Sequence, residues 1–364
     1  MKDNIAFFVS GLDSGGLENY LLRFLKFKSK SYNNIYVFCK SGKGGQLEKY
    51  YLSIPNVNII KIKIGYLDIR DVKKVTSFLK SKKIKIVCDF TGNFSGIILA
   101  SAKILKIRKR VSFYRGSKDH YKHNFIKDIY NYFCKKLVLI TATDILSNSR
   151  AAFEYFYSSE WKKDKRFSVI YNGIDPSSFL SETRCLRADL CIPQSAFVIG
   201  HTGRYNVAKN HSQIIRVAKE MTRRYQDVYF ILCGNGVGKH LKKELESDGL
   251  SNKILVFENR NDIPKFLNTM DCYFFPSITE GQPNALIEAM IMGLPFVASN
   301  IQPIRETVGE GYHLYNPENT DELIFALEEV YRERPTRNEN LQGYTRERFD
   351  YVRNFNAFGT ILDS

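Results

Sequence analysis

The sequence lacks the features that mark membrane-spanning, secreted and many metal-dependent proteins. No stretch approaches the roughly 20 apolar residues that a membrane-spanning helix needs, and the first apolar run is too short for a signal peptide. The seven cysteines form no Cys-x-x-Cys pair and mostly lie in apolar segments, which favours free buried thiols in a reducing compartment. No Asp-x-Asp motif occurs, so a common means of holding a divalent cation is missing. We therefore expect a cytoplasmic protein, soluble or bound to a membrane surface.

Acidic residues are scarce in only one half of the chain. Residues 1–170 contain 33 Lys and Arg against 13 Asp and Glu, whereas residues 171–364 contain 21 against 25. A basic half attracts nucleic acid, anionic lipid or acidic substrates by long-range electrostatic forces. The alternative is a lysine-rich surface that only keeps the chain in solution.

Short apolar segments alternate with helix-like segments along the whole chain. This alternation predicts an α/β protein with parallel, doubly wound sheets, and 364 residues suffice for two domains. Strands are expected at residues 4–10, 34–40, 57–63, 84–89, 109–113, 137–140, 167–171, 197–202, 227–233, 253–257, 271–275 and 295–298.

A polar stretch rich in proline and serine separates the two series of strands. We therefore expect a first domain over residues 1–172, a hinge over 173–195 and a second domain over 196–340. Residues 341–364 have loosely helical aromatic spacing. Whether this last helix crosses back to the first domain or packs on the second is left open.

The segment from Ser277 to Met290 places two carboxylates, Glu280 and Glu288, eight residues apart across a Gly-Pro turn. A strand precedes the turn and a helix follows it, which puts Glu280 on the connecting loop and Glu288 in the helix. A helix start at the carboxyl edge of a sheet suits a phosphate, and carboxylates accept hydrogen bonds from vicinal hydroxyls. The pattern favours a nucleotide sugar as ligand.

Glu280-x7-Glu288 resembles the signature of retaining glycosyltransferases of the GT-B architecture and family 4 type, which assemble bacterial polysaccharides and lipopolysaccharides. Gly15-Gly16, the Asn172-Gly173 junction and Gly203-Arg204 with Lys209 match other family motifs in the same chain order. The resemblance implies two Rossmann-like, doubly wound parallel-sheet domains that face a central cleft. The first domain would bind the acceptor and the second the nucleotide sugar.

The resemblance also implies roles for individual residues. Arg204 and Lys209 would bind the donor diphosphate and, together with Glu280, would carry catalysis. The donor site that it implies comprises Gly15, Gly16, Gly203, Arg204, Lys209, Arg260, Glu280, Gly281, Gln282, Pro283, Asn284, Ala285, Leu286 and Glu288.

In the first domain the sequence departs from the family. Members often carry a histidine on the loop after the fifth strand, where this chain has Arg115. His120 follows closely, so Arg115 and His120 are the candidates for a site on the acceptor side. His120 and His123 form a His-x-x-His pattern, but no further ligand stands at a suitable spacing, so no metal site is expected.

The implied activity is that of a retaining hexosyltransferase in surface polysaccharide biosynthesis. It would move a sugar from a nucleotide-diphosphate sugar, a UDP-sugar rather than a GDP-sugar, to a glycan or lipid-linked glycan, without metal, cofactor or nucleic acid. An epimerase or sugar-phosphate synthase of the same architecture is one alternative. A basic nucleic-acid-binding protein is another, because the first half combines positive charge with many aromatic residues.

Basic and apolar residues gather at helical spacing between residues 97 and 136. Such segments suit docking on anionic lipid, here at the cytoplasmic face of the inner membrane, and packing in the core with solvated lysines is the alternative. The basic members are Lys103, Lys106, Arg108, Lys109, Arg110, Lys122, Lys127, Lys135 and Lys136, and the apolar members include Phe125, Ile126, Ile129, Tyr130 and Phe133.

Overall fold

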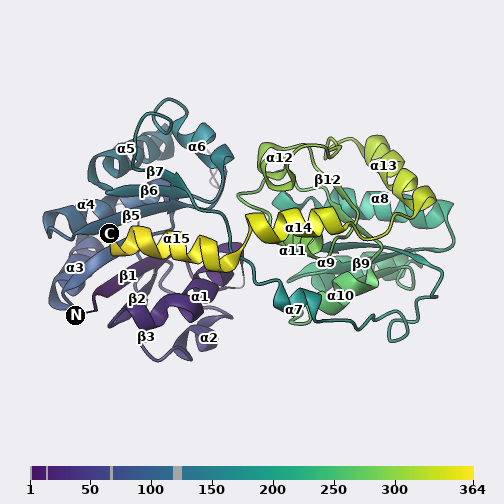
Figure 1. Cartoon of the computed structure of the whole chain (residues 1–364), viewed down its shortest axis with the longest axis horizontal. Coiled ribbons are helices and arrows are strands. Elements are labelled where there is room, and N and C mark those ends of the chain that lie inside the picture. The colour runs from purple at the N-terminus through teal and green to yellow at the C-terminus, as the bar shows by residue number, and fades with distance from the viewer. Residues whose placement is uncertain (1, 14, 66–68, 118–124) are drawn as a thin grey trace. The chain divides into compact units, whose positions relative to one another are not determined.

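The chain folds into two compact units, each with its own sheet (Figure 1). The computed structural model describes residues 2–13, 15–65, 69–117 and 125–364. Unit 1 consists of residues 1–173 and 351–364, and unit 2 consists of residues 174–350. The boundary between Gly173 and Ile174 directly follows the Asn172-Gly173 motif, and the chain returns to unit 1 at Tyr351.

Unit 1 is built on a parallel, doubly wound sheet with the strand order β3-β2-β1-β4-β5-β6-β7. The order reverses between β1 and β4, which is where open α/β sheets bind ligands. The strands are β1 (Asn4–Val9), β2 (Ile35–Cys39), β3 (Val57–Lys61), β4 (Ile84–Asp89), β5 (Lys109–Tyr114), β6 (Asp144–Ser147) and β7 (Phe167–Val169).

Helices cover both faces of this sheet. Successive side chains of each strand point to opposite faces, so both faces carry apolar residues that must be buried. Apolar residues of α1, α2 and α15 pack on the face that carries Phe7, and those of α3, α4, α5 and α6 pack on the face that carries Phe8. The helices are α1 (Gly16–Lys28), η1 (Ser29–Ser31), α2 (Glu48–Leu52), α3 (Ile69–Ser81), η2 (Gly92–Ser95), α4 (Gly96–Ile104), α5 (Phe125–Thr141), α6 (Arg150–Tyr157) and α15 (Tyr351–Asp363).

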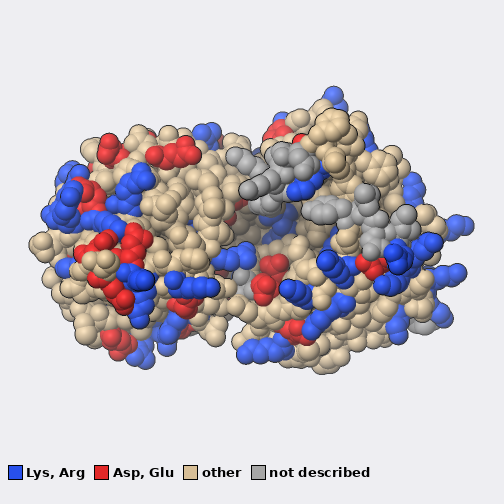
Figure 2. Space-filling model, turned by 180° about the vertical axis from the view of Figure 1, so that it is seen from behind, with Lys and Arg blue, Asp and Glu red and all other residues tan. Residues whose placement is uncertain are grey.

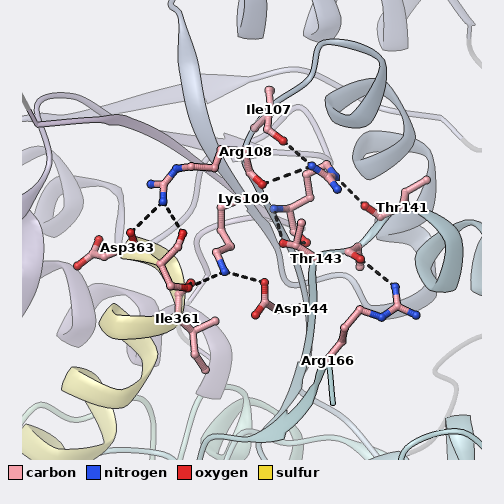
Figure 3. A network of polar contacts seen from close by, with 12 residues as sticks. Ile107, Arg108, Lys109, Thr141, Thr143, Asp144, Arg166, Ile361 and Asp363 are labelled. Atoms are coloured by element: carbon pink, nitrogen blue, oxygen red, sulfur yellow. Dashed lines mark hydrogen bonds and ion pairs between the residues drawn. The ribbon is translucent and has the colours of Figure 1, made fainter. Parts of the chain in front are cut away.

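The last helix, α15, completes the core of unit 1, which answers the question that the sequence left open. Phe355 and Phe358 are buried against Tyr20 and Phe24 of α1. At the far end of α15, Arg108 donates hydrogen bonds to the carbonyl oxygens of Asp363 and Ser364 (Figure 3).

One strand prediction for unit 1 was wrong. Residues 137–140 form the last turns of α5, and the strand β6 lies at Asp144–Ser147. A short apolar run fits a buried strand as well as one face of a helix. Here Val138 faces the core while Ile140 is exposed, a helical pattern that continues the earlier turns of α5.

Unit 2 is built on a second parallel sheet with the strand order β10-β9-β8-β11-β12. Its order reverses between β8 and β11. Apolar residues of α8, α9 and α13 cover one face of the sheet. The strands are β8 (Phe197–Thr202), β9 (Val228–Cys233), β10 (Ile254–Phe257), β11 (Cys272–Phe275) and β12 (Phe296–Ala298).

The helices of unit 2 follow the expected alternation with the strands. They are α7 (Ser177–Leu180), η3 (Val207–Lys209), α8 (His211–Arg224), α9 (Val237–Ser247), α10 (Ile263–Thr269), α11 (Asn284–Ile291), α12 (Gln302–Val308), α13 (Thr320–Glu333) and α14 (Glu339–Arg348). Among the residues that the structure describes, no helix combines the length and hydropathy needed to cross a membrane.

The stretch expected to act as a hinge is partly held within unit 2. The buried Arg187 donates to Asp271 at 2.6 Å and to the carbonyl oxygen of Ala196 at 2.7 Å. The backbone N–H of Leu186 donates to the Thr269 hydroxyl at 2.8 Å. Residues around 186–196 are therefore anchored beside β8 and β11.

Candidate active site

An ion pair between Lys209 and Glu280 lies at the carboxyl edge of the sheet of unit 2. Lys209 ends the short helix η3 after β8, and Glu280 lies on the loop after β11. Because β8 and β11 are neighbours at the point where the strand order reverses, their following loops meet. The Lys209 Nζ atom lies 2.5 Å from the Glu280 Oε1 atom, and the side chains are 17% and 11% exposed.

Backbone and amide hydrogen bonds hold these two loops together. The N–H of Ile278 donates to the carbonyl oxygen of Ala208 at 2.9 Å. Asn210, at φ +60°, donates through its side-chain amide to the carbonyl oxygens of Pro276 at 3.2 Å and Pro317 at 2.9 Å. Asparagine adopts this left-handed backbone more readily than most residues, so the turn that positions Lys209 is locally favoured.

The ammonium of Lys209 has a second neighbour. It lies 4.6 Å from the ring centroid of Phe275, the last residue of β11. An ammonium group has three N–H donors, and the contact with Glu280 uses one or two of them. Lys209 can therefore bind an anionic oxygen while it remains in contact with Glu280.

Arg204 lies on the same edge and is exposed, with no polar partner for its guanidinium in the described parts of the chain. It follows Gly203, which lies very close to the loop after β9. A Cβ atom on Gly234 would lie 2.0 Å from the carbonyl oxygen of Gly203, so only glycine fits there. The Gly234-Asn235-Gly236 turn thus packs directly against the Gly203-Arg204 loop.

Glu288 lies in α11, as expected, and half-buried. Both acidic residues of the motif act on the fully buried Tyr273 of β11. Burial is the main reason why the pKa of Tyr273 lies well above its ordinary value, and the charges of Glu288 and Glu280 raise it further. Tyr273 bonds to the Thr202 hydroxyl at 2.7 Å, at the end of β8. The two carboxylates of the motif therefore share one neighbourhood.

The amino terminus of α11 faces this neighbourhood without a side-chain cap. Its N-cap is Pro283, and the first intrahelical bond runs from the N–H of Ile287 to the Pro283 carbonyl oxygen. The N–H groups of Ala285 and Leu286 therefore have no acceptor within the helix. Gln282 and Pro283 are buried, and Gly281 and Asn284 are half-buried. This helix start can donate hydrogen bonds to an anion.

Two buried hydroxyl groups on the same loop were given no role at the site from the sequence. The Ser277 Oγ and Thr279 Oγ1 atoms have no hydrogen-bond partner among the residues that the structure describes. Buried polar atoms usually have a hydrogen-bond partner, and these two atoms lie on the loop that carries Glu280. A bound ligand or an ordered water is the natural partner.

The side chain of Arg260 binds an acidic residue of its own loop. Its Nε and Nη2 atoms each lie 2.9 Å from the Asp262 carboxylate, which raises the pKa of the guanidinium. Glu258, on the same loop after β10, accepts hydrogen bonds at 2.7 Å from the N–H groups of Gly236 and Lys239. The amino terminus of α9 therefore already binds a carboxylate.

Two buried histidines lie next to Lys209, and no motif in the sequence predicted them. The rings of His201 and His211 are 5.2 Å apart, and the His201 Nδ1 atom contacts the Phe274 carbonyl oxygen at 2.9 Å. Burial lowers the pKa of His201 well below its ordinary value and that of His211 to about 4, and the Lys209 charge acts in the same direction. Both rings are therefore neutral at neutral pH.

The predicted residues of unit 1 gather at the carboxyl edge of its own sheet. Gly16 begins α1, and the extended Gly15 precedes it. Arg115 follows β5, donates to the Asn172 side chain at 2.5 Å and lies over the Tyr20 ring at 3.9 Å. Burial lowers the pKa of Arg115 to about 10, so it stays charged at neutral pH. His120 lies outside the described residues.

Family models match nearly the whole chain in two consecutive parts. Residues 14–178 match the model described as Glycosyltransferase Family 4, and residues 184–348 match the model described as Glycosyl transferases group 1. The division between the two matches falls near the boundary between unit 1 and unit 2.

Curated relatives come from bacterial polysaccharide assembly. The chain is 27% identical over 301 residues to the capsular polysaccharide biosynthesis glycosyltransferase CapH of Staphylococcus aureus, which covers 80% of each protein. It is 32% identical over 143 residues to the UDP-Gal:alpha-D-GlcNAc-diphosphoundecaprenol alpha-1,3-galactosyltransferase of Escherichia coli. That second match covers 37% of each protein.

A solved structure shares the fold over the whole chain. The crystal structure of HepE from Anabaena, in complex with UDP, matches with a TM-score of 0.80, 21% sequence identity and 99% coverage of both chains. This likeness confirms the GT-B fold expected from the sequence, with two Rossmann-like domains.

Proposed function

The chain belongs to the family 4 glycosyltransferases, and we propose that it transfers a sugar from a UDP-sugar to a lipid-linked glycan. The transfer would proceed with retention at the anomeric carbon, without a metal ion, during assembly of a surface polysaccharide at the cytoplasmic face of a membrane. Family membership argues against the nucleic-acid-binding alternative, whereas the epimerase and synthase alternatives share the architecture and stay open to the assay described below.

The observation that carries this proposal is the Lys209–Glu280 ion pair where the strand order of unit 2 reverses. One loop supplies a cation and the next supplies a carboxylate, within hydrogen-bond distance. A sugar diphosphate needs both, because its phosphates are anionic and its sugar hydroxyls donate hydrogen bonds.

We assign the parts of the donor to the groups of unit 2 on this basis. Arg204 and Lys209 would bind the diphosphate, together with the N–H groups of Ala285 and Leu286 at the start of α11. Glu280 would accept hydrogen bonds from the sugar and Glu288 from the ribose. The guanidinium of Arg260, held by Asp262, would leave the base to backbone groups of its loop.

The proposed reaction needs charge stabilisation more than a protein nucleophile. The bond between the anomeric carbon and the diphosphate oxygen breaks, and negative charge grows on the leaving UDP. Arg204 and Lys209 oppose that charge, which lowers the barrier because it is greatest in the transition state. The acceptor hydroxyl forms the new bond on the same face and passes its proton to an oxygen of the leaving diphosphate.

The acceptor class is inferred from a relative and from the candidate residues of unit 1. The Escherichia coli relative is named for an acceptor carried on diphosphoundecaprenol and for a UDP-Gal donor. HepE has been solved in complex with UDP-glucose. In unit 1, Gly15, Gly16 and the charged Arg115 are the candidates, because an arginine suits the diphosphate of a lipid-linked acceptor.

Thermal stabilisation by nucleotides tests the donor assignment. UDP should raise the melting temperature more than GDP or ADP, since a ligand that binds only the folded state stabilises it. Turnover of a UDP-sugar with a lipid-diphosphate acceptor should persist in EDTA, and the product should keep the donor's anomeric configuration by NMR. Stabilisation by GDP or ADP alone, or loss of turnover in EDTA, would refute the UDP or metal-independent part.

The same assay separates the remaining alternatives. An epimerase would convert the UDP-sugar without any acceptor, and a sugar-phosphate synthase would require a soluble sugar phosphate. Either result would replace the proposed acceptor while leaving the donor assignment in place.

A further inference from the structure

Helix α5 of unit 1 exposes an apolar stripe along its whole length. Phe125, Ile129 and Phe133 follow one another at spacings of four and are 79%, 54% and 57% exposed. Ile126, Tyr132 and Ile140 lie on the same side and are also exposed. The opposite side of the helix, with Cys134 and Val138, is buried in the core. The helix thus carries apolar residues on its exposed side as well as on its buried side. A surface helix in contact with water alone usually has a polar exposed side.

The stripe continues onto the neighbouring helix α4. Ile104, at the end of α4, is 79% exposed. Lys103 of α4 donates to the Ile140 carbonyl oxygen at 3.0 Å, which ties the ends of the two helices together. We call the exposed side chains of Ile104, Phe125, Ile126, Ile129, Tyr132, Phe133 and Ile140 the α5 surface.

Exposed lysines border the α5 surface. Lys136 lies within it, 5.4 Å from the Tyr132 ring centroid, and Lys103 and Lys106 lie beside Ile104. They belong to a strongly basic region, since residues 1–170 carry 33 Lys and Arg against 13 Asp and Glu. Blue side chains accordingly outnumber red ones over much of unit 1 in the view of Figure 2, on its right side.

Three other basic residues expected on this surface are committed within unit 1. Lys109 is buried and bonds to Asp144 at 2.9 Å, and Arg108 binds residues of α15 (Figure 3). Arg110 donates to the carbonyl oxygens of Ile107 at 2.5 Å and Thr141 at 2.7 Å. These side chains hold the strand ends and α15 in place, so we do not include them in the surface proposed below.

We propose that the α5 surface inserts its apolar side chains into the interface of an anionic lipid bilayer, with Lys106 and Lys136 against the head groups. Aromatic and branched apolar groups beside lysines are what an interfacial helix uses, and the long lysine side chains can place their ammonium groups at head-group level. A positive region is drawn to the negative surface of a cytoplasmic leaflet. This inference rests on the proposed function, because a lipid-linked acceptor is the reason for the protein to bind a membrane. Vesicle binding itself can be measured without turnover.

Flotation with vesicles of phosphatidylcholine and phosphatidylglycerol in equal parts tests the proposal. The apolar variant combines Ile126→Ser, Ile129→Ser and Phe133→Ser, and should lose affinity by more than roughly tenfold. The charge variant combines Lys106→Gln and Lys136→Gln, and should lose affinity only for the anionic vesicles. Wild-type binding should fall when NaCl rises from about 0.01 M to about 1 M, because the screening length drops from about 30 Å to about 3 Å.

Matched variants in unit 2 serve as controls. Phe325→Ser removes an exposed phenylalanine of α13, 55% exposed, and Lys242→Gln with Lys243→Gln removes two lysines of α9. Both should bind vesicles as the wild type does. Because the substituted side chains are exposed, the melting temperature and the shift caused by UDP should be unchanged in every variant, which shows that the donor site is intact.

Three outcomes would overturn the proposal. They are wild-type protein that does not float with anionic vesicles at low salt, an apolar variant that floats as well as the wild type, and an apolar variant that changes from dimer to monomer in size-exclusion chromatography. The last result would assign the α5 surface to a second copy of the chain. A loss of the UDP shift in the wild type would refute the proposed donor instead and leave the vesicle result standing.

Discussion

The Nζ atom of Lys209 lies 2.5 Å from the Oε1 atom of Glu280, although 71 positions separate the two residues in the chain. The fold brings them together because β8 and β11 are adjacent while the chain between them forms β9 and β10 on the other side. The pair is mostly shielded from solvent, so each charge depends on the other. This geometry leads to the first prediction.

Replacing either member of the pair should reduce turnover far more than it reduces stability. We expect Lys209→Met and Glu280→Gln each to lower kcat by about 10²–10³-fold, as loss of one preorganised group in an active site does. The double variant should be little worse than either single variant, since the two side chains act as a unit. Steady-state kinetics and thermal melts measure both effects. Lys243→Met on α9 is the control, and a kcat near wild type in either single variant would contradict the assignment.

Removing Arg204 should weaken donor binding without changing the stability of the free protein. Its guanidinium is exposed and has no polar partner in the described ranges, so truncation breaks nothing in the absence of ligand. A charge-assisted hydrogen bond contributes about 1.5–3 kcal/mol, so Arg204→Ala should raise the Kd for UDP by roughly 10–100-fold. Isothermal titration measures this. Arg216→Ala, an exposed arginine of α8, should leave the Kd unchanged, and equal affinities for both variants would remove Arg204 from the site.

Gly234→Ala should disturb the loop that carries Arg204. The added Cβ atom would lie 2.0 Å from the Gly203 carbonyl oxygen, so the backbone of one loop must move. We expect a drop in the melting temperature together with loss of stabilisation by UDP, both seen in a thermal melt. Gly343→Ala in α14 is the matched control, since nothing lies within 4 Å of its added Cβ. It should be neutral or stabilise the protein by about 0.5–1 kcal/mol. A Gly234→Ala protein with a normal UDP shift would contradict the prediction.

The buried histidines should make stability depend on pH. The pKa of His211 falls from about 6.5 in the unfolded chain to about 4 in the folded protein, and that of His201 is also lowered. Between these values the unfolded chain binds protons that the folded protein does not. Stability is therefore full above about pH 6.5 and falls as the pH drops, with a slope of up to about 1.4 kcal/mol per pH unit for each histidine.

Urea unfolding at several pH values between about 7 and about 4 measures this slope, because this range spans the folded and unfolded pKa values of His211. His211→Gln should make the slope shallower whatever its effect on stability at pH 7. His240→Gln, at an exposed position of α9, is the control for loss of a surface histidine. An unchanged slope in His211→Gln would mean that the pKa of His211 is the same in the folded and unfolded protein, which would contradict the prediction.

The positions of most candidate donor-site residues in the fold could be predicted because these residues lie in short motifs at strand ends, whereas their role at the donor stays a prediction. Alternation of strands and helices fixed the carboxyl edge, and the glycine, arginine, lysine and glutamate motifs fell on loops of that edge. The contact between Lys209 and Glu280 could not be read directly, since it depends on which strands are neighbours. Thr279, His201 and His211 were missed, and Ser277 was given no role, because a hydroxyl or imidazole gives no periodic signal when it is buried among apolar residues.

The errors have related physical causes. The apolar run 137–140 fits a strand until the preceding turns of α5 are considered with it. Lys109 looked like a surface charge because Asp144, its partner at 2.9 Å, is 35 residues away in the chain. The contact of Arg260 with Asp262, two residues later, was likewise not anticipated, and a role of Arg260 at the donor stays a prediction. Local sequence thus shows charge, but not whether a distant or nearby carboxylate has already neutralised it.

The return of the chain to unit 1 at Tyr351 bears on how the protein emerges from the ribosome. Phe355, Phe358 and Leu362 belong to the core of unit 1 but are synthesised after all of unit 2. Unit 2 can therefore become native while the domain made first still exposes the apolar face that α15 covers. The domain that is translated first is thus the last to mature, and it stays vulnerable to aggregation and to chaperone capture until translation of the final helix.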